Sequence, residues 1–301
     1  MRQQLCCDGP VSTLKNEPAQ LRSVAETLAG EASAFVRRRR GEVFGPDART
    51  QGNAAVRSKT TPTDPVTVVD TETERLLRDR LAQLRSGDPV LGEEIGGPTD
   101  PTDNVAGTVT WVLDPIDGTV NFVYGIPGYA VSVAAQVDGV SVAGAVADIM
   151  GGQLYSAAAG LGAHLVDQQG THPLGCTAVD DLSMALVGTG FAYSRRRRTV
   201  QAALVANILP MVRDVRRIGS AAMDLCMVAA GRLDAYYEHG LHVWDCAAGA
   251  LIAAEAGARV VLPEPGHPDS TGALVVAAAP GIADQLLAAL EQFDGLGPIA
   301  G

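Results

Sequence analysis

The segment WVLDPIDGTVNF, residues 111–122, places two aspartates three residues apart after a short apolar run and follows them with Gly118 and Thr119. Acidic residues have a similar setting in two other places: Glu93 in LGEEIGG, and Asp245 at the start of a helical pattern in HVWDCAAG. Aspartate and glycine are also common turn residues, so each segment alone is explained by a turn. Three such segments, each after an apolar stretch, predict one shared acidic site.

Carboxylates that meet at one place repel each other and raise each other's pKa unless a cation neutralises them. These segments offer oxygen ligands without His or Cys, a set that suits Mg²⁺, Ca²⁺ or Mn²⁺ better than zinc, and we expect Mg²⁺. A glycine followed by a hydroxyl residue at a turn or helix start exposes backbone amides to an anion such as phosphate. The combination predicts phosphoryl chemistry, with a metal-activated water as the nucleophile.

The elements that must position these acids in the first part of the chain are predicted from the spacing of apolar residues. We expect a helix over about residues 18–39, a loop over 41–59 and a second amphipathic helix over 71–85. Asp70 would be the N-cap of the second helix. Alternatively, TETE at 71–74 forms a capping box, which leaves Asp70 free for the site.

Strand patterns begin near residue 108, where Asp138-Gly139 joins two alternating runs and predicts a hairpin in a mostly antiparallel sheet. Strands and helices alternate after about residue 180. We therefore predict a layered α/β (α+β) fold in one body, with an N-terminal antiparallel-sheet half and a C-terminal α/β half. The predicted divisions are a loose tail over 1–17, the first half over about 18–180 and the second half over 181–301.

Composition limits the possible partners. The chain of 301 residues carries a net charge of -11, which disfavours nucleic acid as a partner, and the arginine runs at 37–40 and 195–198 are interpreted as solvated faces. No apolar run reaches the roughly 18 residues of a membrane span, and the N-terminus lacks the pattern of a signal peptide. The five cysteines include no C-x-x-C. We expect a cytoplasmic protein with reduced thiols and no membrane partner.

Two of these segments also resemble the signatures of a known family. WVLDPIDGTVNF resembles the first signature of the inositol monophosphatase family and VWDCAAGALIAAEAGARV the second, with KTTPTDPVTVVD and GEE upstream in the expected order. The likeness covers residues from about 18 to 295 and extends to the SuhB-type members of actinobacteria. It implies a layered α-β-α-β-α sandwich of the sugar-phosphatase type, and a Mg²⁺-dependent, lithium-sensitive homodimer that hydrolyses inositol 1-phosphate.

The resemblance also implies a metal-binding set for two or three Mg²⁺ ions. Glu93, Asp114 and the backbone carbonyl of Ile116 would hold the first ion. Asp114, Asp117 and Asp245 would hold the second, and a weaker third ion would lie near Glu93. Both ions would therefore share Asp114.

Further residues receive catalytic and substrate roles from the same resemblance. Thr119, oriented by Asp70, would position and deprotonate the attacking water, while the amides of Gly118 and Thr119 hold the phosphate and Lys59 comes from the loop that covers the site. Glu238 and the segment IGSAA would contact inositol. The implied catalytic set is Thr119, Asp70, Glu93 and Lys59, and the implied substrate set is Asp117, Gly118, Thr119, Gly219, Ser220, Ala221, Glu238 and Asp245.

Other functions stay open at this point. The same metal core could act on fructose-1,6-bisphosphate, histidinol phosphate or 3'-phosphoadenosine phosphates. A covalent aspartyl-phosphate phosphatase of the haloacid-dehalogenase type also opens with a strand and DGT, although its two acids are separated by one residue rather than two. A regulatory role in transcription is the alternative outside enzymology.

Overall fold

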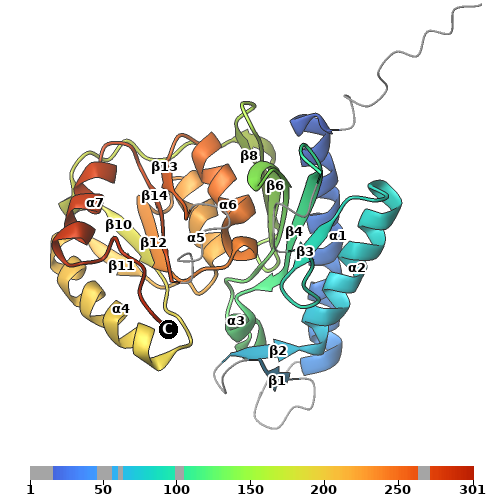
Figure 1. Cartoon of the computed structure of the whole chain (residues 1–301), viewed down its shortest axis with the longest axis horizontal. Helices are drawn as coiled ribbons and strands as arrows, with labels where there is room; N and C mark the ends of the chain where they lie inside the picture. Colours follow the sequence, from blue (N-terminus) through green and yellow to red (C-terminus); the bar gives the residue numbers. More distant parts are fainter. Residues whose placement is uncertain (1–15, 46–55, 60–63, 99–104, 264–271) are drawn as a thin grey trace, which may run out of the picture.

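The computed structural model describes residues 16–45, 56–59, 64–98, 105–263 and 272–301. Helices and sheets alternate in five layers (Figure 1). The expected layered α-β-α-β-α sandwich is confirmed. Among the helices of the described ranges, none is both long and apolar enough to cross a membrane.

The larger sheet has seven strands in the order β3-β4-β5-β6-β7-β8-β9, and all neighbours are antiparallel except β3 and β4. Asp138 and Gly139 both have positive φ, 50° and 79°, which gives β5 and β6 the predicted tight hairpin. The strands are β3 (Val90–Gly92), β4 (Val109–Asp117), β5 (Ala130–Val137), β6 (Val140–Asp148), β7 (Gln153–Ala158), β8 (Ala163–Asp167) and β9 (Gly170–Pro173).

The smaller sheet has five strands in the order β11-β10-β12-β14-β13, with a parallel side and an antiparallel side. Its strands are β10 (Leu186–Thr189), β11 (Asp214–Arg216), β12 (Ala235–His239), β13 (Arg259–Val261) and β14 (Leu274–Ala278). A separate antiparallel ribbon joins β1 (Val56–Ser58) and β2 (Pro65–Thr67).

The helices cover both faces of both sheets. They are α1 (Pro18–Phe44), α2 (Val68–Leu84), α3 (Thr119–Tyr124), α4 (Arg195–Ile208), α5 (Ala221–Ala229), α6 (Val243–Glu255) and α7 (Ala283–Gln292). Helices α1 and α2 form one outer layer, α4 and α7 the other, and α5 and α6 lie between the sheets (Figure 1).

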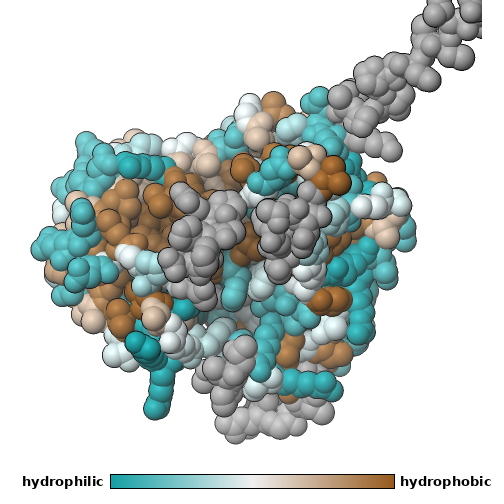
Figure 2. Space-filling view, viewed as in Figure 1, coloured by the Kyte–Doolittle hydropathy of each residue, from teal (hydrophilic) through white to brown (hydrophobic). Residues whose placement is uncertain are grey.

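Four apolar cores bind the five layers together. One lies between α1, α2 and the seven-stranded sheet, and a second joins the opposite face of that sheet to α5 and α6. A third joins α5 and α6 to the five-stranded sheet, and a fourth lies between that sheet and α4 and α7. The central helices are therefore apolar on two sides, which fits the nearly unbroken small apolar run of α6. Polar residues cover much of the face in Figure 2, and apolar side chains gather toward α7 and β14.

Some predicted boundaries are wrong. Helix α1 continues to Phe44, so the expected loop from residue 41 begins too early, and its end forms β1. Residues 46–55 of that loop, and residues 1–15 of the expected tail, lie outside the described ranges. Helix α3 has no counterpart among the sequence predictions, because its six residues are too few to show a helical period.

Both predicted starts of the second helix are also wrong. The N-cap of α2 is Thr67, whose hydroxyl accepts from the amides of Val69 and Asp70. The side chain of Asp70 in turn accepts from the Thr67 amide, at 3.0 Å, which completes a capping box one turn earlier than expected. Asp70 therefore lies inside the first turn of α2.

Candidate active site

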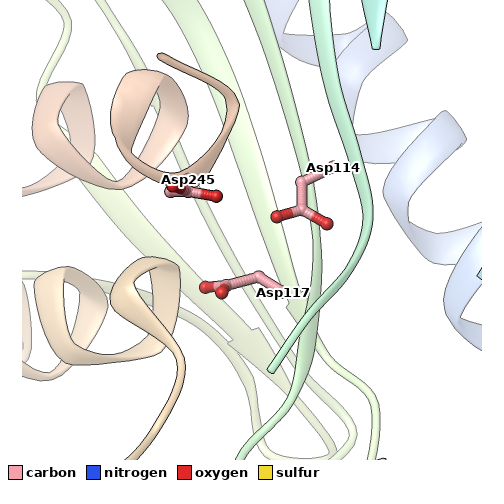
Figure 3. A group of neighbouring side chains, drawn as sticks. All are labelled: Asp114, Asp117 and Asp245. Atoms are coloured by element: carbon pink, nitrogen blue, oxygen red, sulfur yellow. The ribbon is translucent and has the colours of Figure 1, made fainter. Parts of the chain in front are cut away.

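Three carboxylates from two separate elements converge between the larger sheet and the central helices. Asp114 and Asp117 lie at the end of β4 and Asp245 in the first turn of α6, and their side chains point toward one another (Figure 3). Ligand oxygens of the three acids all lie within 4.8 Å of one another. The expected convergence of the WVLDPIDGT and HVWDC segments is thus present.

The two aspartates of β4 belong to a strand rather than to the turn that the sequence suggested. The pairing of β4 with β5 changes register between Asp114 and Asp117, which indicates a bulge at this end of the strand. A regular strand would place residues three apart on opposite faces. The irregularity allows both side chains to reach the same site.

Burial raises the pKa of each acid in this cluster, and the neighbouring carboxylates raise it further. The pKa of Asp117 rises to about 7, and those of Asp114 and Asp245 rise well above the ordinary value. Buried carboxylates of one sign are costly unless a cation or a proton neutralises them. The cluster therefore suits a hard divalent cation, for which carboxylate oxygens are the preferred donors.

Backbone and hydroxyl donors hold these acids in place. Oδ2 of Asp117 accepts from Ser220 Oγ at 2.7 Å and from the Ala222 amide at 2.6 Å, which ties β4 to the start of α5. Oδ1 of Asp114 accepts from the Ile116 amide at 3.0 Å. Oδ2 of Asp245 accepts from the His242 amide at 2.7 Å. Their orientation is thus fixed before any ion binds.

A second group of polar residues adjoins the cluster. Thr119 Oγ1 lies 3.2 Å from Oδ1 of Asp70 and 3.1 Å from the carbonyl oxygen of Ile116. Asp70 is fully buried, and burial raises its pKa to about 6 although hydrogen bonds from Thr67 oppose the rise. The structure therefore places Asp70 and Thr119, two predicted catalytic residues, in direct contact.

Glu93 adjoins the three-acid group through Asp114 and also contacts a lysine. Lys59 Nζ is 2.7 Å from Oε1 of Glu93 and 2.5 Å from Oε1 of Glu94. Burial lowers the pKa of Lys59, but the two glutamates outweigh burial and raise it, while burial raises the pKa of Glu94 to about 7. The ammonium group supplies the positive charge that Glu93 would otherwise take from a cation.

Glu74 is a residue of this region that the sequence reasoning assigned only to a cap. It is fully buried on α2, and its carboxylate accepts from the amides of Glu94 at 2.7 Å and Ile95 at 3.2 Å. Arg78 donates to it from one turn later, at 2.8 Å. The position of Glu74 in the sequence, four residues after Asp70 and three before the core residue Leu77, places it on the same helix face as both and could have predicted its burial.

The corner after Asp117 requires glycine. Gly118 has a φ of 94°, and a Cβ there would lie 2.9 Å from the Gly128 carbonyl oxygen and 3.0 Å from that of Gly219. Asn121 stabilises the same corner by donating to the carbonyl oxygens of Gly128 and Ile218, each at 2.8 Å. Because Gly118 lies this close to Gly219, the predicted phosphate-binding residues adjoin the predicted sugar-binding segment.

The predicted substrate residues occupy different environments. Ser220 is the N-cap of α5 and donates to Asp117, and Ala221 is buried beside it. Glu238, on β12, accepts from the Tyr236 hydroxyl at 2.5 Å. Burial raises the pKa of Glu238, while the Tyr236 bond and the charge of Arg217 oppose the rise.

Comparisons with known proteins agree with this architecture. The family model described as "Inositol monophosphatase family" matches residues 17–294. An inositol-1-monophosphatase of Mycobacterium leprae is 74% identical over 94% of this chain and 98% of its own length. The solved structure of Mycobacterium tuberculosis SuhB superposes with a TM-score of 0.79 and 66% identity, over 93% of this chain and 99% of that one.

A more distant relative carries a different name. The Nus factor SuhB of Escherichia coli K12 is 35% identical over 80% of this chain and 91% of its own length. The family model matches nearly the whole chain, and the three clustered aspartates lie in the two segments that resemble the family signatures. This chain is therefore an enzyme of the inositol monophosphatase family.

Proposed function

We propose that the protein is a Mg²⁺-dependent phosphomonoesterase that hydrolyses inositol 1-phosphate to inositol and phosphate. The observation that carries this proposal is the convergence of Asp114, Asp117 and Asp245 within 4.8 Å, directly beside the corner formed by Gly118 and Thr119. Carboxylates alone would repel a phosphate ester. Cations bound by the three carboxylates would neutralise this repulsion and allow a phosphate group to bind beside them.

The donor set fits Mg²⁺. We assign Glu93, Asp114 and the Ile116 carbonyl to one ion and Asp114, Asp117 and Asp245 to a second, and, from the family resemblance, a weaker third ion to the neighbourhood of Glu93. Bound Mg²⁺ would supply Lewis-acid polarisation of the phosphoryl oxygens and lower the pKa of a water. The raised pKa values of the aspartates support the assignment, because these acids gain most from a cation.

Thr119 and Asp70 would handle the proton of the attacking water. The Thr119 hydroxyl lies 3.2 Å from Oδ1 of Asp70, and Thr67 donates to the other oxygen of that carboxylate. With a pKa raised to about 6, Asp70 is ionised at neutral pH yet basic enough to accept a proton. Thr119 would thus orient the water while the Asp70 carboxylate would take up its proton.

The remaining residues would hold the ester. We assign the amides of Gly118 and Thr119 to the phosphate, together with the substrate-facing sides of Asp117 and Asp245. Glu238 would accept hydrogen bonds from inositol hydroxyls, and the backbone of Gly219, Ser220 and Ala221 would line the ring. Lys59 would balance the charge of Glu93 and Glu94, which it contacts directly.

A rate panel tests the substrate. Metal-free protein is given Mg²⁺ and then inositol 1-phosphate, fructose-1,6-bisphosphate, histidinol phosphate or 3'-phosphoadenosine phosphate, and released phosphate is measured. We expect the highest kcat/KM for inositol 1-phosphate and loss of turnover in Asp114→Asn. Preference for another ester would correct the substrate but keep the reaction, whereas a trapped phosphoenzyme would replace the direct attack of water by covalent catalysis.

We also propose a homodimer in the cytoplasm that lithium inhibits, on the basis of the family resemblance. Light scattering gives the mass in solution, and a lithium titration at fixed Mg²⁺ gives the inhibition. A transcriptional role, suggested by the name of the Escherichia coli relative, would appear as binding of polymerase factors that survives Asp245→Asn. We expect no such binding.

A further inference from the structure

Two neighbouring tyrosines of β12 face opposite sides of the five-stranded sheet. Side chains alternate along a strand, so Tyr236 and Glu238 share one face and Tyr237 lies on the other. Tyr236 is fully buried in the core between that sheet and the central helices, whereas Tyr237 is buried in the core beneath the outer helices. Only the first of the two hydroxyls is therefore on the side of Glu238.

The core around Tyr236 adjoins the acidic cluster. It contains Ala221, which directly follows Ser220, and the Ser220 hydroxyl donates to the cluster at 2.7 Å. It also contains Cys246, which directly follows the cluster member Asp245. The packing of Tyr236 thus connects β12 to the two helix starts that border the predicted active site.

The carboxylate of Glu238 is held in one place by its surroundings. Its Oε2 accepts from the Tyr236 hydroxyl at 2.5 Å. Gly190, the residue directly after β10, makes room for the carboxylate, because an added Cβ there would collide with both of its oxygens. Among the described residues no donor bonds to Oε1, and Glu238 is only half-buried. Tyr236 thus fixes one oxygen and leaves the other able to accept from a ligand.

We propose that Tyr236 is a positioning residue for sugar recognition, which holds the Glu238 carboxylate so that Oε1 accepts a hydrogen bond from one ring hydroxyl of the ester. The inference rests on the proposed function, in which Glu238 contacts the sugar. A carboxylate already held in place loses less conformational freedom on binding than a free glutamate side chain would. The pair therefore favours esters that carry a ring hydroxyl over esters that carry none.

The adjacent tyrosine provides a matched control. The Tyr237 hydroxyl is also buried, but it has no hydrogen-bond partner among the described residues. We compare Tyr236→Phe with Tyr237→Phe, since each removes one buried hydroxyl from the same strand. Gly190→Ala is a second variant, in which the added methyl group displaces the flexible end of Glu238. Its control is Gly175→Ala, because an added Cβ at this exposed glycine meets nothing within 4 Å in the described structure beyond its chain neighbours.

The measurement is the ratio of kcat/KM on inositol 1-phosphate to kcat/KM on phenyl phosphate, whose ring carries no hydroxyl. Damage to the fold or to the metal site lowers both values and leaves the ratio unchanged. We expect Tyr236→Phe and Gly190→Ala to lower the ratio about 10-fold, through a higher KM for inositol 1-phosphate, because an ordered charged acceptor is lost. Tyr237→Phe and Gly175→Ala should keep the wild-type ratio.

A double-mutant cycle tests whether Tyr236 acts through Glu238. Glu238→Ala should lower the same ratio, and Tyr236→Phe added to it should lower the ratio less than about twofold further. The inference is overturned by an unchanged ratio in Tyr236→Phe or Gly190→Ala, by an equal fall in Tyr237→Phe, or by a full further fall in the Glu238→Ala background.

Failure of the proposed function is a separate result, because it appears in the wild-type protein. A wild-type ratio no higher than that of Glu238→Ala would remove the contact between Glu238 and the sugar, and the inference with it. If the wild-type protein prefers another hydroxylated ester of the rate panel, the same ratio is measured with that ester, and the selective fall in Tyr236→Phe is again required.

Discussion

Replacing Asp117 by Asn should stabilise the metal-free protein and abolish its stabilisation by Mg²⁺. The pKa of Asp117 is about 7 in the fold, against an ordinary value of 3.8. At 1.36 kcal/mol per pKa unit, ionising it at pH 8 costs up to about 4 kcal/mol of folding free energy. Asn keeps an oxygen for the Ser220 and Ala222 donors but loses about 1 kcal/mol of charge-assisted bonding, so a gain of about 2–3 kcal/mol remains.

The sign of this effect changes with pH in a defined window. Because the folded-state pKa is raised, the penalty of Asp117 is absent below about pH 4, grows as the pH rises from about 4 to about 7, and is constant above. Denaturant unfolding of metal-free wild type and Asp117→Asn at pH 4.5 and pH 8 therefore measures it. The advantage of the variant should be small at the lower pH and full at the higher one.

Mg²⁺ should reverse the order of stability. A ligand at 1,000 times its Kd stabilises a native protein by about 4.1 kcal/mol, more than the advantage of the variant, and wild type should gain this whereas Asp117→Asn should not. Asp284→Asn is the control. The Asp284 side chain is 88% exposed and belongs to α7, in an outer layer of the fold. A metal-free Asp117→Asn protein that is less stable than wild type at pH 8, or an advantage independent of pH, would refute the reasoning.

Three further predictions address the neighbours of the cluster. The value of log(kcat/KM) should rise with unit slope up to about pH 6 and then level off, because Asp70 must be ionised to accept a proton; a flat profile from pH 5 to 8 would contradict this. Thr119→Val should lower kcat about 100-fold while calorimetry shows that Mg²⁺ still binds, since the lost hydroxyl contacts Asp70 and the Ile116 carbonyl oxygen but none of the three clustered aspartates. Glu74→Gln should cost about 1–3 kcal/mol in denaturant unfolding, because the amides of Glu94 and Ile95 lose a buried charged acceptor, whereas Glu72→Gln, at a half-buried side chain paired with Arg39, should cost less than about 1 kcal/mol.

The sequence predicts the large elements of this fold well, because long apolar repeats dominate their local signal. Helices α1 and α6 and the β5–β6 hairpin lie close to their expected positions. The sequence predicts the short elements poorly. Helix α3 has only six residues. The start of α2 depends on its N-cap Thr67, but the segment TVVDTETE contains three residues that could cap a helix, and the sequence does not decide between them.

The candidate site is predicted in its residue types but only partly in its contacts. The convergence of Asp114, Asp117 and Asp245 was expected, whereas the register shift that makes it possible was not, because spacing along a strand carries no information about a bulge. The bond between Ser220 and Asp117 joins residues 103 positions apart. Such pairs depend on tertiary packing, which the spacing of residues along the sequence does not reveal.

The release of phosphate from inositol 1-phosphate by metal-free protein, as Mg²⁺ is added back, tests the proposed catalytic metal site most directly. We predict no turnover without the ion, full turnover with it, and none at any Mg²⁺ concentration in Asp114→Asn, because that carboxylate lies in the three-acid cluster. Unchanged turnover in the presence of a chelator, or wild-type turnover by Asp114→Asn, would contradict the claim that this cluster is a catalytic metal site.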